Sequence, residues 1–157
     1  MEHLYARLDA LRQKLTDEAF LENRGLSNEV GLYIFRYPPQ EEMAVRAFMQ
    51  GLCREMDGSA GKCRILFFDL YEILLGILER IPQMEAQRGG AFTLAQIQKL
   101  APPEAYVQRM QYPDHRPGDV VMIAGVGRVF PYMRSHHVLN NLQHLFDDVP
   151  VVMLYPG

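Results

Sequence analysis

The chain has 157 residues, of which 48% are hydrophobic and 22% are charged, and its formal net charge is −3 at pH 7. This length and balance are typical of one globular domain with a sizeable core, and they exclude a disordered tail, a collagen-like chain and a disulfide-stapled miniprotein. The net acidity also argues against a protein that grips nucleic acid with its whole surface.

The sequence carries no pattern of secretion or membrane insertion. Residues 1–15 are charged every few positions, unlike a signal peptide. No apolar stretch approaches the roughly 18 residues that a membrane-spanning helix needs. Cys53 and Cys63 form no CxxC pair, so two thiols in a reducing compartment are the simplest interpretation. We therefore expect a cytoplasmic protein without a membrane partner.

The N-terminal segment, residues 1–25, is expected to hold an amphipathic helix. Its leucines recur at helical spacing, at Leu4, Leu8, Leu11 and Leu15. The stripe is either core or a partner surface, and so short a stripe favours core. A β-branched and aromatic run then predicts a strand over 30–37, which Pro38 and Pro39 stop.

A helix with one apolar face follows this strand; the face consists of Val45, Phe48, Met49, Leu52, Cys53 and Met56. After a glycine-rich turn at 58–61, the run RILFFD over 64–69 predicts a strand that is buried on both faces. Apolar positions spaced by three and four predict a helix over 70–81, which Pro82 ends.

The chain then carries two shorter helices. Thr93 and Gln96 form a capping box for a helix that ends near Leu100. Pro102-Pro103 opens the next helix, because proline is tolerated in a first turn. A turn-rich loop is expected over 114–119.

Apolar runs over 120–124 and 149–155 predict two more strands, separated by a helix that is marked by Val138, Leu139, Leu142, Leu145 and Phe146. Four apolar strands alternating with helices indicate a single α/β domain over 1–157, built on a three-layer open parallel sheet with helices on both faces. The strands then end at one carboxyl edge of the sheet, at Tyr37, Asp69, Gly125 and Tyr155.

Neither glycine-rich loop carries a nucleotide-binding pattern. The loop GSAGKC at 58–63 has two residues between its glycines where a Walker A loop has four, and it precedes a strand instead of following one. The loop GVGRVF at 125–130 has Phe130 where a dinucleotide fingerprint has its third glycine. We therefore expect no nucleotide cofactor.

The segment 120–146 contains no Asp or Glu but several basic side chains. Part of it lies near a helix N-terminus, where unpaired N–H groups favour anions. Arginine and aromatic residues are also enriched at interface centres. The candidate partner- or anion-binding residues are Arg128, Phe130, Tyr132, Arg134, Ser135 and His136. A structural interpretation is favoured slightly over this one: Arg134 pairs with a buried carboxylate such as Asp69, and Ser135 only caps a helix.

Catalytic patterns are incomplete. Asp69 ends a strand, where many α/β enzymes place a metal ligand or a base, but it is also a good N-cap for the helix that follows, and the cap is favoured. Ser135 and His136 are adjacent, and neighbours on a helix point about 100° apart, so they form no nucleophile–base pair. No histidine or cysteine spacing indicates a metal site. We expect no metal, and no ATP or GTP hydrolysis.

Several strings together resemble the BrxB family, a small component of BREX bacteriophage-exclusion systems. They are NRGLSNEVG at 23–31, DLYEIL at 69–74, GVGRVFPY at 125–132, RSH at 134–136, NNL at 140–142, PVV at 150–152 and YPG at 155–157. The resemblance implies a P-loop-like or Rossmann-like topology without a Walker A loop. Because family members continue past the YPG string, it also implies a chain that is truncated at its C-terminus relative to the family.

The same resemblance implies a function in phage defence. Such a protein is encoded beside a PglZ alkaline-phosphatase-like protein, a PglX-like methyltransferase and a BrxC-like ATPase, and supports host DNA methylation and phage restriction. We expect a non-catalytic adaptor that binds another component, first the PglZ-like protein. The alternative is a cryptic nucleotide- or phosphate-binding enzyme that uses the carboxyl edge of the sheet. A direct nucleic-acid contact is disfavoured by the net acidity.

Overall fold

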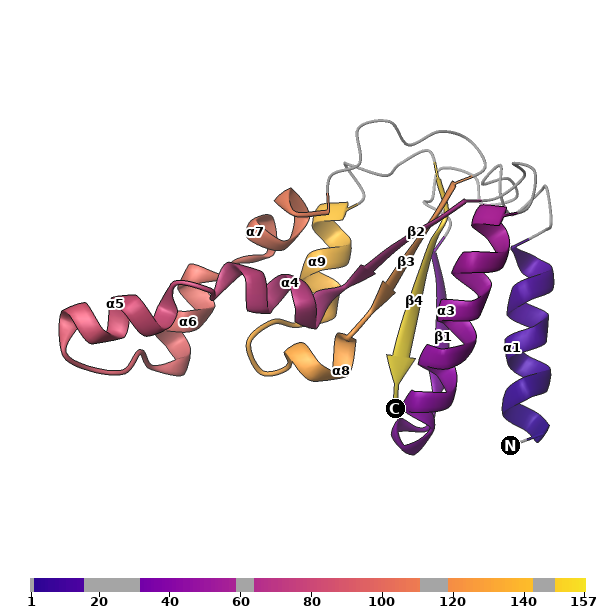
Figure 1. Cartoon of the computed structure of the whole chain (residues 1–157), viewed down its shortest axis with the longest axis horizontal. Helices are drawn as coiled ribbons and strands as arrows, with labels where there is room; N and C mark the ends of the chain where they lie inside the picture. The colour runs from indigo at the N-terminus through magenta and orange to yellow at the C-terminus, as the bar shows by residue number, and fades with distance from the viewer. Residues whose placement is uncertain (1, 16–31, 59–63, 111–118, 143–148) are drawn as a thin grey trace.

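A computed structural model describes residues 2–15, 32–58, 64–110, 119–142 and 149–157. Four parallel strands form one sheet in the order β1-β4-β3-β2 (Figure 1). The strands are β1 (Leu32–Tyr37), β2 (Arg64–Asp69), β3 (Asp119–Ala124) and β4 (Val151–Pro156). The predicted α/β class is confirmed.

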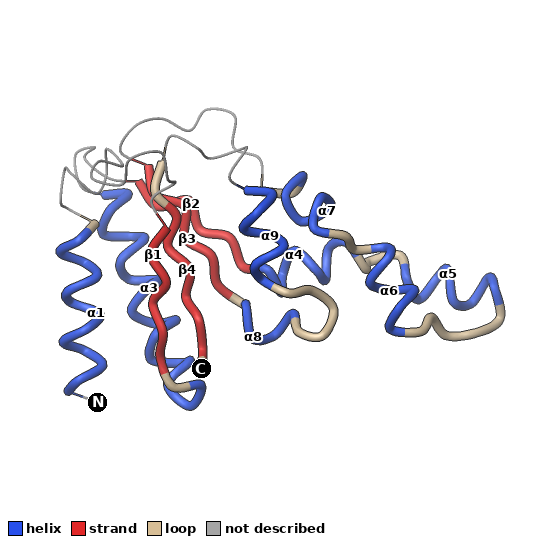
Figure 2. Tube along the Cα trace, turned by 180° about the vertical axis from the view of Figure 1, so that it is seen from behind, coloured by secondary structure: helices blue, strands red, loops and turns tan. Residues whose placement is uncertain are grey.

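Helices cover both faces of this sheet, as predicted. One face carries α1 (Glu2–Lys14) and α3 (Glu42–Gly58), and a short 3-10 helix, η1 (Pro39–Glu41), precedes α3. The other face carries α4 (Leu70–Ile77), α7 (Pro103–Gln108), α8 (Val126–Val129) and α9 (Ser135–Leu142). Two further helices, α5 (Ile81–Arg88) and α6 (Leu94–Leu100), project sideways from this layer (Figure 2).

The core on the first face contains the leucine stripe. Leu4, Leu8, Leu11 and Leu15 are all buried, so the stripe is core and not a partner surface. It packs with the apolar face of α3, where Val45, Met49 and Leu52 are buried and Phe48 and Cys53 are partly buried. The side chain of Met56 lies outside the described residues.

The core on the second face rests on the two central strands. Every residue of β3 is buried, because β3 has a strand on each side and a helical layer on each face. Tyr106 of α7 and Val138 of α9 are fully buried against this face. Buried residues in β3 and in α9 therefore hold the acid-free segment in place before and after α8.

The position of β2 in the sheet differs from the prediction. Its apolar sequence predicted burial on both faces, but β2 is an edge strand, and Phe67 is 37% exposed. Ile65 and Leu66 are buried, one in each core. An apolar run shows that a strand has two covered faces over part of its length, but it does not show whether a neighbouring strand lies on each side.

The helix predicted over 70–81 is also corrected. Helix α4 ends at Ile77, and Pro82 lies in the first turn of the next helix, α5, instead of ending the first one. Proline lacks an N–H group, which a first turn leaves unpaired in any case, so it fits a helix start as well as a stop. The capping box of Thr93 and Gln96 is confirmed at the start of α6.

The remaining predicted strands and helices are present where the structure describes them, with shifted bounds. Helix α7 opens at Pro103, β4 begins at Val151 instead of 149, and Asp119, predicted in a loop, is the first residue of β3. The sequence patterns did not predict helices α5 and α8. Residues 59–63 with Cys63, the loop at 114–118, and Leu145 and Phe146 lie outside the described residues.

Candidate functional site

The carboxyl ends of all four strands meet at one edge of the sheet. Tyr37 at the end of β1 lies opposite Pro156 of β4, and Asp69 at the end of β2 lies opposite Ala124 of β3. Open α/β sheets place their ligands at this edge. The shared edge predicted for the strand ends is therefore confirmed.

Two glycines of the GVG string hold the chain tightly against this edge. Gly125 has φ of 76°, and a Cβ atom there would lie 2.2 Å from Oδ1 of Asp69. A Cβ atom on Gly127 would lie 2.9 Å from Cγ of Pro156. The two glycines thus let α8 pack closely against the ends of β2 and β4, a packing role that needs no dinucleotide.

Asp69 joins two helices at this edge. Its Oδ1 accepts hydrogen bonds from the N–H groups of Tyr71 at 2.9 Å and Glu72 at 3.3 Å, which caps α4. Its Oδ2 accepts a hydrogen bond from Nη1 of Arg46 at 2.9 Å. The carboxylate thus pairs with Arg46 of α3 and not with Arg134, so the ion pair considered for Arg134 is wrong.

Arg46 extends this pair into a cluster at the β1 end. Its Nε donates to Oε1 of Glu42 at 3.0 Å, and the hydroxyl of Tyr37 donates to the same carboxylate. Burial, followed by the hydrogen bond to Glu42, raises the pKa of Tyr37. Burial alone would lower the pKa of Arg46, but its hydrogen bonds to Asp69 and Glu42 raise it. The cluster keeps its charges paired and links α3 to β1 and β2.

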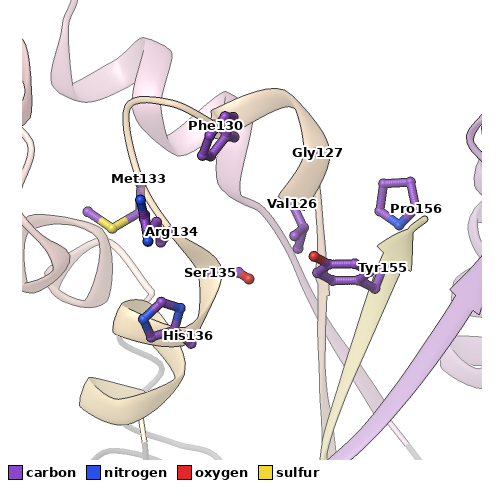
Figure 3. A pocket seen from close by; sticks show the side chains of 9 residues that line it. All are labelled: Val126, Gly127, Phe130, Met133, Arg134, Ser135, His136, Tyr155 and Pro156. Atoms are coloured by element: carbon purple, nitrogen blue, oxygen red, sulfur yellow. The ribbon is translucent and has the colours of Figure 1, made fainter. Parts of the chain in front are cut away.

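A pocket of about 420 Å³ opens on the other side of the same edge. Figure 3 shows Tyr155 reaching in from the end of β4 and Ser135 facing it from the start of α9. Its lining residues are Val126, Gly127, Phe130, Met133, Arg134, Ser135, His136, Tyr155 and Pro156. No carboxylate is among them. The structure thus brings together four predicted site residues: Phe130, Arg134, Ser135 and His136.

The other two predicted residues lie beside the pocket. The Arg128 guanidinium stacks 4.0 Å from the ring centroid of Tyr71, and Tyr132 is half-buried against the second core. The Arg36 guanidinium lies 5.5 Å from the ring centroid of Tyr155, which lines the pocket. A guanidinium over an exposed aromatic ring gains about 0.5–1 kcal/mol.

Sequence reasoning missed Arg36 and Arg46 as parts of this edge, and it placed Tyr155 at the edge without naming it as a binding residue. The spacing of Glu42 and Arg46 could have indicated a helical ion pair. The stacking of Arg36 on Tyr155 depends on the pairing of β1 with β4, which no local pattern carries. The contact between Arg36 and Tyr155 could therefore be found only once the order of the strands was known.

The side chains that line the pocket are suited to binding a ligand more than to catalysis. His136 packs edge-on against His137, with ring centroids 4.2 Å apart. Within the described part of the chain, no group of three or more His, Cys, Asp or Glu side chains is placed to hold a metal ion. A cationic and aromatic hollow of this kind can take up an acidic or aromatic side chain, or a phosphate.

Comparison with known proteins identifies the family. A sequence model described as "BREX protein BrxB" matches residues 66–157. A BREX protein BrxB from Bacillus cereus (strain H3081.97) is 39% identical over 166 residues, covering 100% of this chain and 86% of that protein. The chain belongs to the BrxB family. A second BREX protein BrxB, from Escherichia coli O9:H4 (strain HS), is 29% identical over 158 residues, covering 96% of this chain and 78% of that protein.

Family membership confirms the resemblance seen in the sequence and makes the chain a component of a BREX system. No solved structure matches the chain, so the likeness to P-loop-like or Rossmann-like topology stays a prediction. Among the helices of the described residues, none has the length and apolar character to cross a membrane.

Proposed function

We propose that this BrxB protein is a non-catalytic adaptor whose carboxyl edge binds an acidic segment of another BREX component. The PglZ-like protein is the first candidate, followed by the BrxC-like ATPase and the PglX-like methyltransferase. Through this contact the adaptor supports host DNA methylation and phage restriction in the cytoplasm. The observation that carries the proposal is the pocket at this edge, which is cationic, aromatic and free of carboxylates.

The pocket has the composition of an interface centre. Phe130 is 63% exposed although it is a large aromatic, and Tyr155 is also exposed. Arg134 and His136, which are also exposed, line the pocket with them. Aromatic residues and arginine are the types that contribute most to binding energy when a partner covers them. An acidic partner side chain placed at Arg134 would also find no like charge among the residues that line the pocket.

Exposed apolar side chains of Leu32 and Ile34 form a strip along the edge strand β1, beside the pocket. On β1, Leu32 and Ile34 are both exposed and share a face with Arg36, because side chains two residues apart in a strand point the same way. The β1–β4 register places Arg36 beside Tyr155. A stable complex needs roughly 800 Å² from each partner, and the strip supplies apolar area beyond the pocket itself.

The non-catalytic part of the proposal is supported by the use of Asp69. This carboxylate is the acid at the end of β2, and it is occupied by the α4 cap and by Arg46. It is also not among the residues that line the pocket, so it is not placed to act on a substrate there. Ser135 and His136 line the pocket as neighbours in sequence, where their side chains diverge.

The test is co-purification of tagged PglZ-like protein with the wild-type chain and with the Arg134→Glu variant. We expect Arg134→Glu to reduce the captured partner at least about tenfold, because reversing a charge at an interface centre costs more than about 1.4 kcal/mol. Its melting temperature should match the wild type, because Arg134 is exposed. Arg54→Glu, at an exposed arginine on α3, is the matched control and should capture the partner normally.

The rival function, nucleotide or phosphate binding, rests on Arg134, Ser135 and His136 at the first turn of α9, where backbone N–H groups favour an anion. Calorimetric titration with ATP and with inorganic phosphate separates the two. Saturable nucleotide binding that Arg134→Glu abolishes, together with unchanged partner capture, would favour the rival. If Arg134→Glu unfolds the chain, Arg134 is structural and the edge is not a free docking surface.

A further inference from the structure

Strand β1 lies at one edge of the sheet, and the described helices cover only one of its faces. It is the first strand in the order β1-β4-β3-β2, so among the described residues a strand pairs with it on one side alone. On the second face of the sheet, Leu32 is 40% exposed and Ile34 is 39% exposed. Figures 1 and 2 show α8 and α9 gathered towards β2 and β3, away from β1. An edge strand of this kind is a template for pairing with another chain.

The outer side of β1 presents backbone groups that no described strand pairs. The carbonyl of Tyr37 accepts the N–H of Gly157 at 2.8 Å, so the backbone groups of Tyr37 face the β4 side. Successive residues of a strand direct their backbone groups to opposite sides, and those of Arg36 and Ile34 therefore face outward. The side chain of Arg7 on α1 donates to the carbonyl of Arg36, which agrees with this direction. The N–H groups of Ile34 and Arg36 are thus placed to bond an added strand.

This outer side is also basic. The Arg7 guanidinium lies 4.6 Å from the ring centroid of Phe35, and the Arg36 guanidinium lies 5.5 Å from that of Tyr155. Neither arginine forms an ion pair with a carboxylate of the described residues. A guanidinium has five N–H donors, and stacking on a ring uses none of them. The charge of this edge is therefore complementary to an acidic segment.

The opposite edge strand, β2, has its charges paired within the fold. Arg64 at its start pairs with Asp119 of β3, where Nη2 lies 2.7 Å from Oδ2. Asp69 at its end pairs with Arg46 and caps α4. Of the two edge strands, β1 is therefore the one that combines unpaired backbone groups with cations that no described carboxylate neutralises.

We propose that the acidic partner segment binds β1 in an extended conformation, as a fifth strand of the sheet, with carboxylates beside Arg7 and Arg36. This inference rests on the proposed function, because it takes the acidic segment proposed there and assigns its conformation and path. The β1–β4 register places Arg36 beside Tyr155, which lines the pocket. A segment that pairs with β1 therefore continues into the pocket at the carboxyl edge.

Strand addition also predicts the side-chain pattern of the segment. Main-chain hydrogen bonds give affinity in this mode, and alternate side chains give specificity. On the second face, the side chains of an added strand lie beside Leu32, Ile34 and Arg36, because side chains on one face of paired strands are neighbours. The segment should therefore carry apolar residues at two alternate positions and an acid at the next one, nearest the pocket.

The test is capture of the tagged PglZ-like protein by Ile34→Pro and by Ile34→Ala, each measured beside the wild type. Proline removes the outward N–H of this residue, whereas alanine keeps the N–H and shortens the same side chain. Proline is accepted on an edge strand where its N–H would face solvent, so Ile34→Pro should melt close to the wild type. We expect Ile34→Pro to capture about tenfold less partner or lower, because it leaves a carbonyl of the segment unpaired in the interface.

Ile34→Ala is the matched control, and its loss of capture should be clearly smaller than that of Ile34→Pro. Equal capture by the two variants would mean that only the side chain matters, and would overturn strand addition. If the PglZ-like protein does not bind the wild type, the BrxC-like and PglX-like components take its place in the same assay. Failure of all three to bind would overturn both the inference and the proposed function.

Arg134→Glu, measured in the same series, separates the inference from the proposed function. Loss of capture by Arg134→Glu, with equal capture by Ile34→Pro and Ile34→Ala, would keep the pocket as the binding site and overturn strand addition. Normal capture by Arg134→Glu, with loss by Ile34→Pro, would support strand addition and overturn the pocket.

Amide exchange of the wild-type chain, resolved by NMR, decides the matter if Ile34→Pro does not fold. In the complex with the partner, the amides of Ile34 and Arg36 should exchange more slowly than in the free chain, because they become hydrogen-bonded to the added strand. The amide of Phe35 should change less, because it faces the β4 side already. Unchanged exchange at Ile34 and Arg36, or equal slowing at all three amides, would overturn strand addition.

Discussion

The carboxyl edge and the arm, which we define as residues 78–100 with helices α5 and α6, both expose large apolar side chains, but they are ordered in different ways. Beneath the edge, α8 contributes Val126 and Val129 to the second core, and Met133 and Val138 continue that anchorage. The arm has no buried side chain and keeps its shape through caps and turns. The edge is therefore a rigid surface whose outer residues can change without loss of the fold, whereas the arm depends on local contacts and on whatever covers it.

The largest expected effect separates core from arm with a matched pair of leucines. Leu74→Ala, at a fully buried α4 position, should lower the free energy of unfolding by about 2–5 kcal/mol, because it leaves a cavity in the second core. Leu94→Ala in the arm should change it by about 0.5 kcal/mol or less in dilute protein, because Leu94 is already exposed. Urea denaturation of both variants checks this. Equal losses would mean that the arm is part of the cooperative core.

The next effect tests what supports the edge. Asp69→Ala should lower the free energy of unfolding by about 2–3 kcal/mol, because it removes the cap of α4 and leaves Arg46 without its partner on β2. The upper range for a buried pair does not apply, since Arg46 is partly exposed to solvent. Asp9→Ala is the control, because Asp9 is exposed and accepts a hydrogen bond from Gln13 on its own helix. A loss for Asp69→Ala no greater than for Asp9→Ala would contradict the structural role of the cluster.

A smaller effect should stay inside the arm. Thr93→Ala removes the hydroxyl that accepts the Gln96 N–H, which is the side-chain cap of α6, and should destabilise that helix by about 0.5–2 kcal/mol. Because the arm has no buried side chain, the loss should appear as faster amide exchange within 94–100, with the global unfolding midpoint unchanged. Gln83→Ala, at an exposed position on α5, should leave exchange in α6 as it is. A lowered global midpoint would show that the arm unfolds together with the sheet.

The smallest effect concerns a tyrosine hydroxyl in the second core. Tyr106 is fully buried, and its hydroxyl has no hydrogen-bond partner among the described residues. Tyr106→Phe should therefore leave stability at pH 7 unchanged or raise it by about 1 kcal/mol or less. A clear loss of stability at pH 7 would indicate a partner for the hydroxyl.

The same residue predicts a pH dependence. Burial raises the pKa of Tyr106 from its usual 10.0 to about 12. Between these values the folded chain keeps a proton that the unfolded chain releases, so stability should fall as pH rises from 10 towards 12. Tyr106→Phe should lose less stability over this interval than the wild type, as measured by urea denaturation at each pH. Parallel curves for the two proteins would contradict this assignment.

The strands and most helices could be predicted because their patterns are local. The runs that became β3 and β4 are apolar throughout, as central strands of a parallel sheet require. The edge position of β2 could not be predicted, because it depends on which strands pair. The role of Pro82 was ambiguous for a physical reason: a proline suits a helix start as well as a helix stop.

The candidate site could be predicted only in part. The segment from the end of α8 to the start of α9 carries Phe130, Arg134, Ser135 and His136, so its composition indicated a binding site. The contribution of Tyr155 and Arg36 depends on the pairing of β4 with β1, and the partner of Asp69 comes from α3, far away in sequence. The arm could not be predicted, because no local pattern indicated α5 and only the tertiary structure shows that α5 and α6 bury no side chain.

The equilibrium affinity of the purified chain for the PglZ-like protein tests the central claim most directly. Titrations with the wild type, Arg134→Glu and Arg54→Glu would be compared at low and high salt. We predict that Arg134→Glu weakens binding at least about tenfold and lowers its salt dependence, while Arg54→Glu binds like the wild type. Equal affinity of Arg134→Glu and the wild type, with both folded, would contradict a partner site at the carboxyl edge.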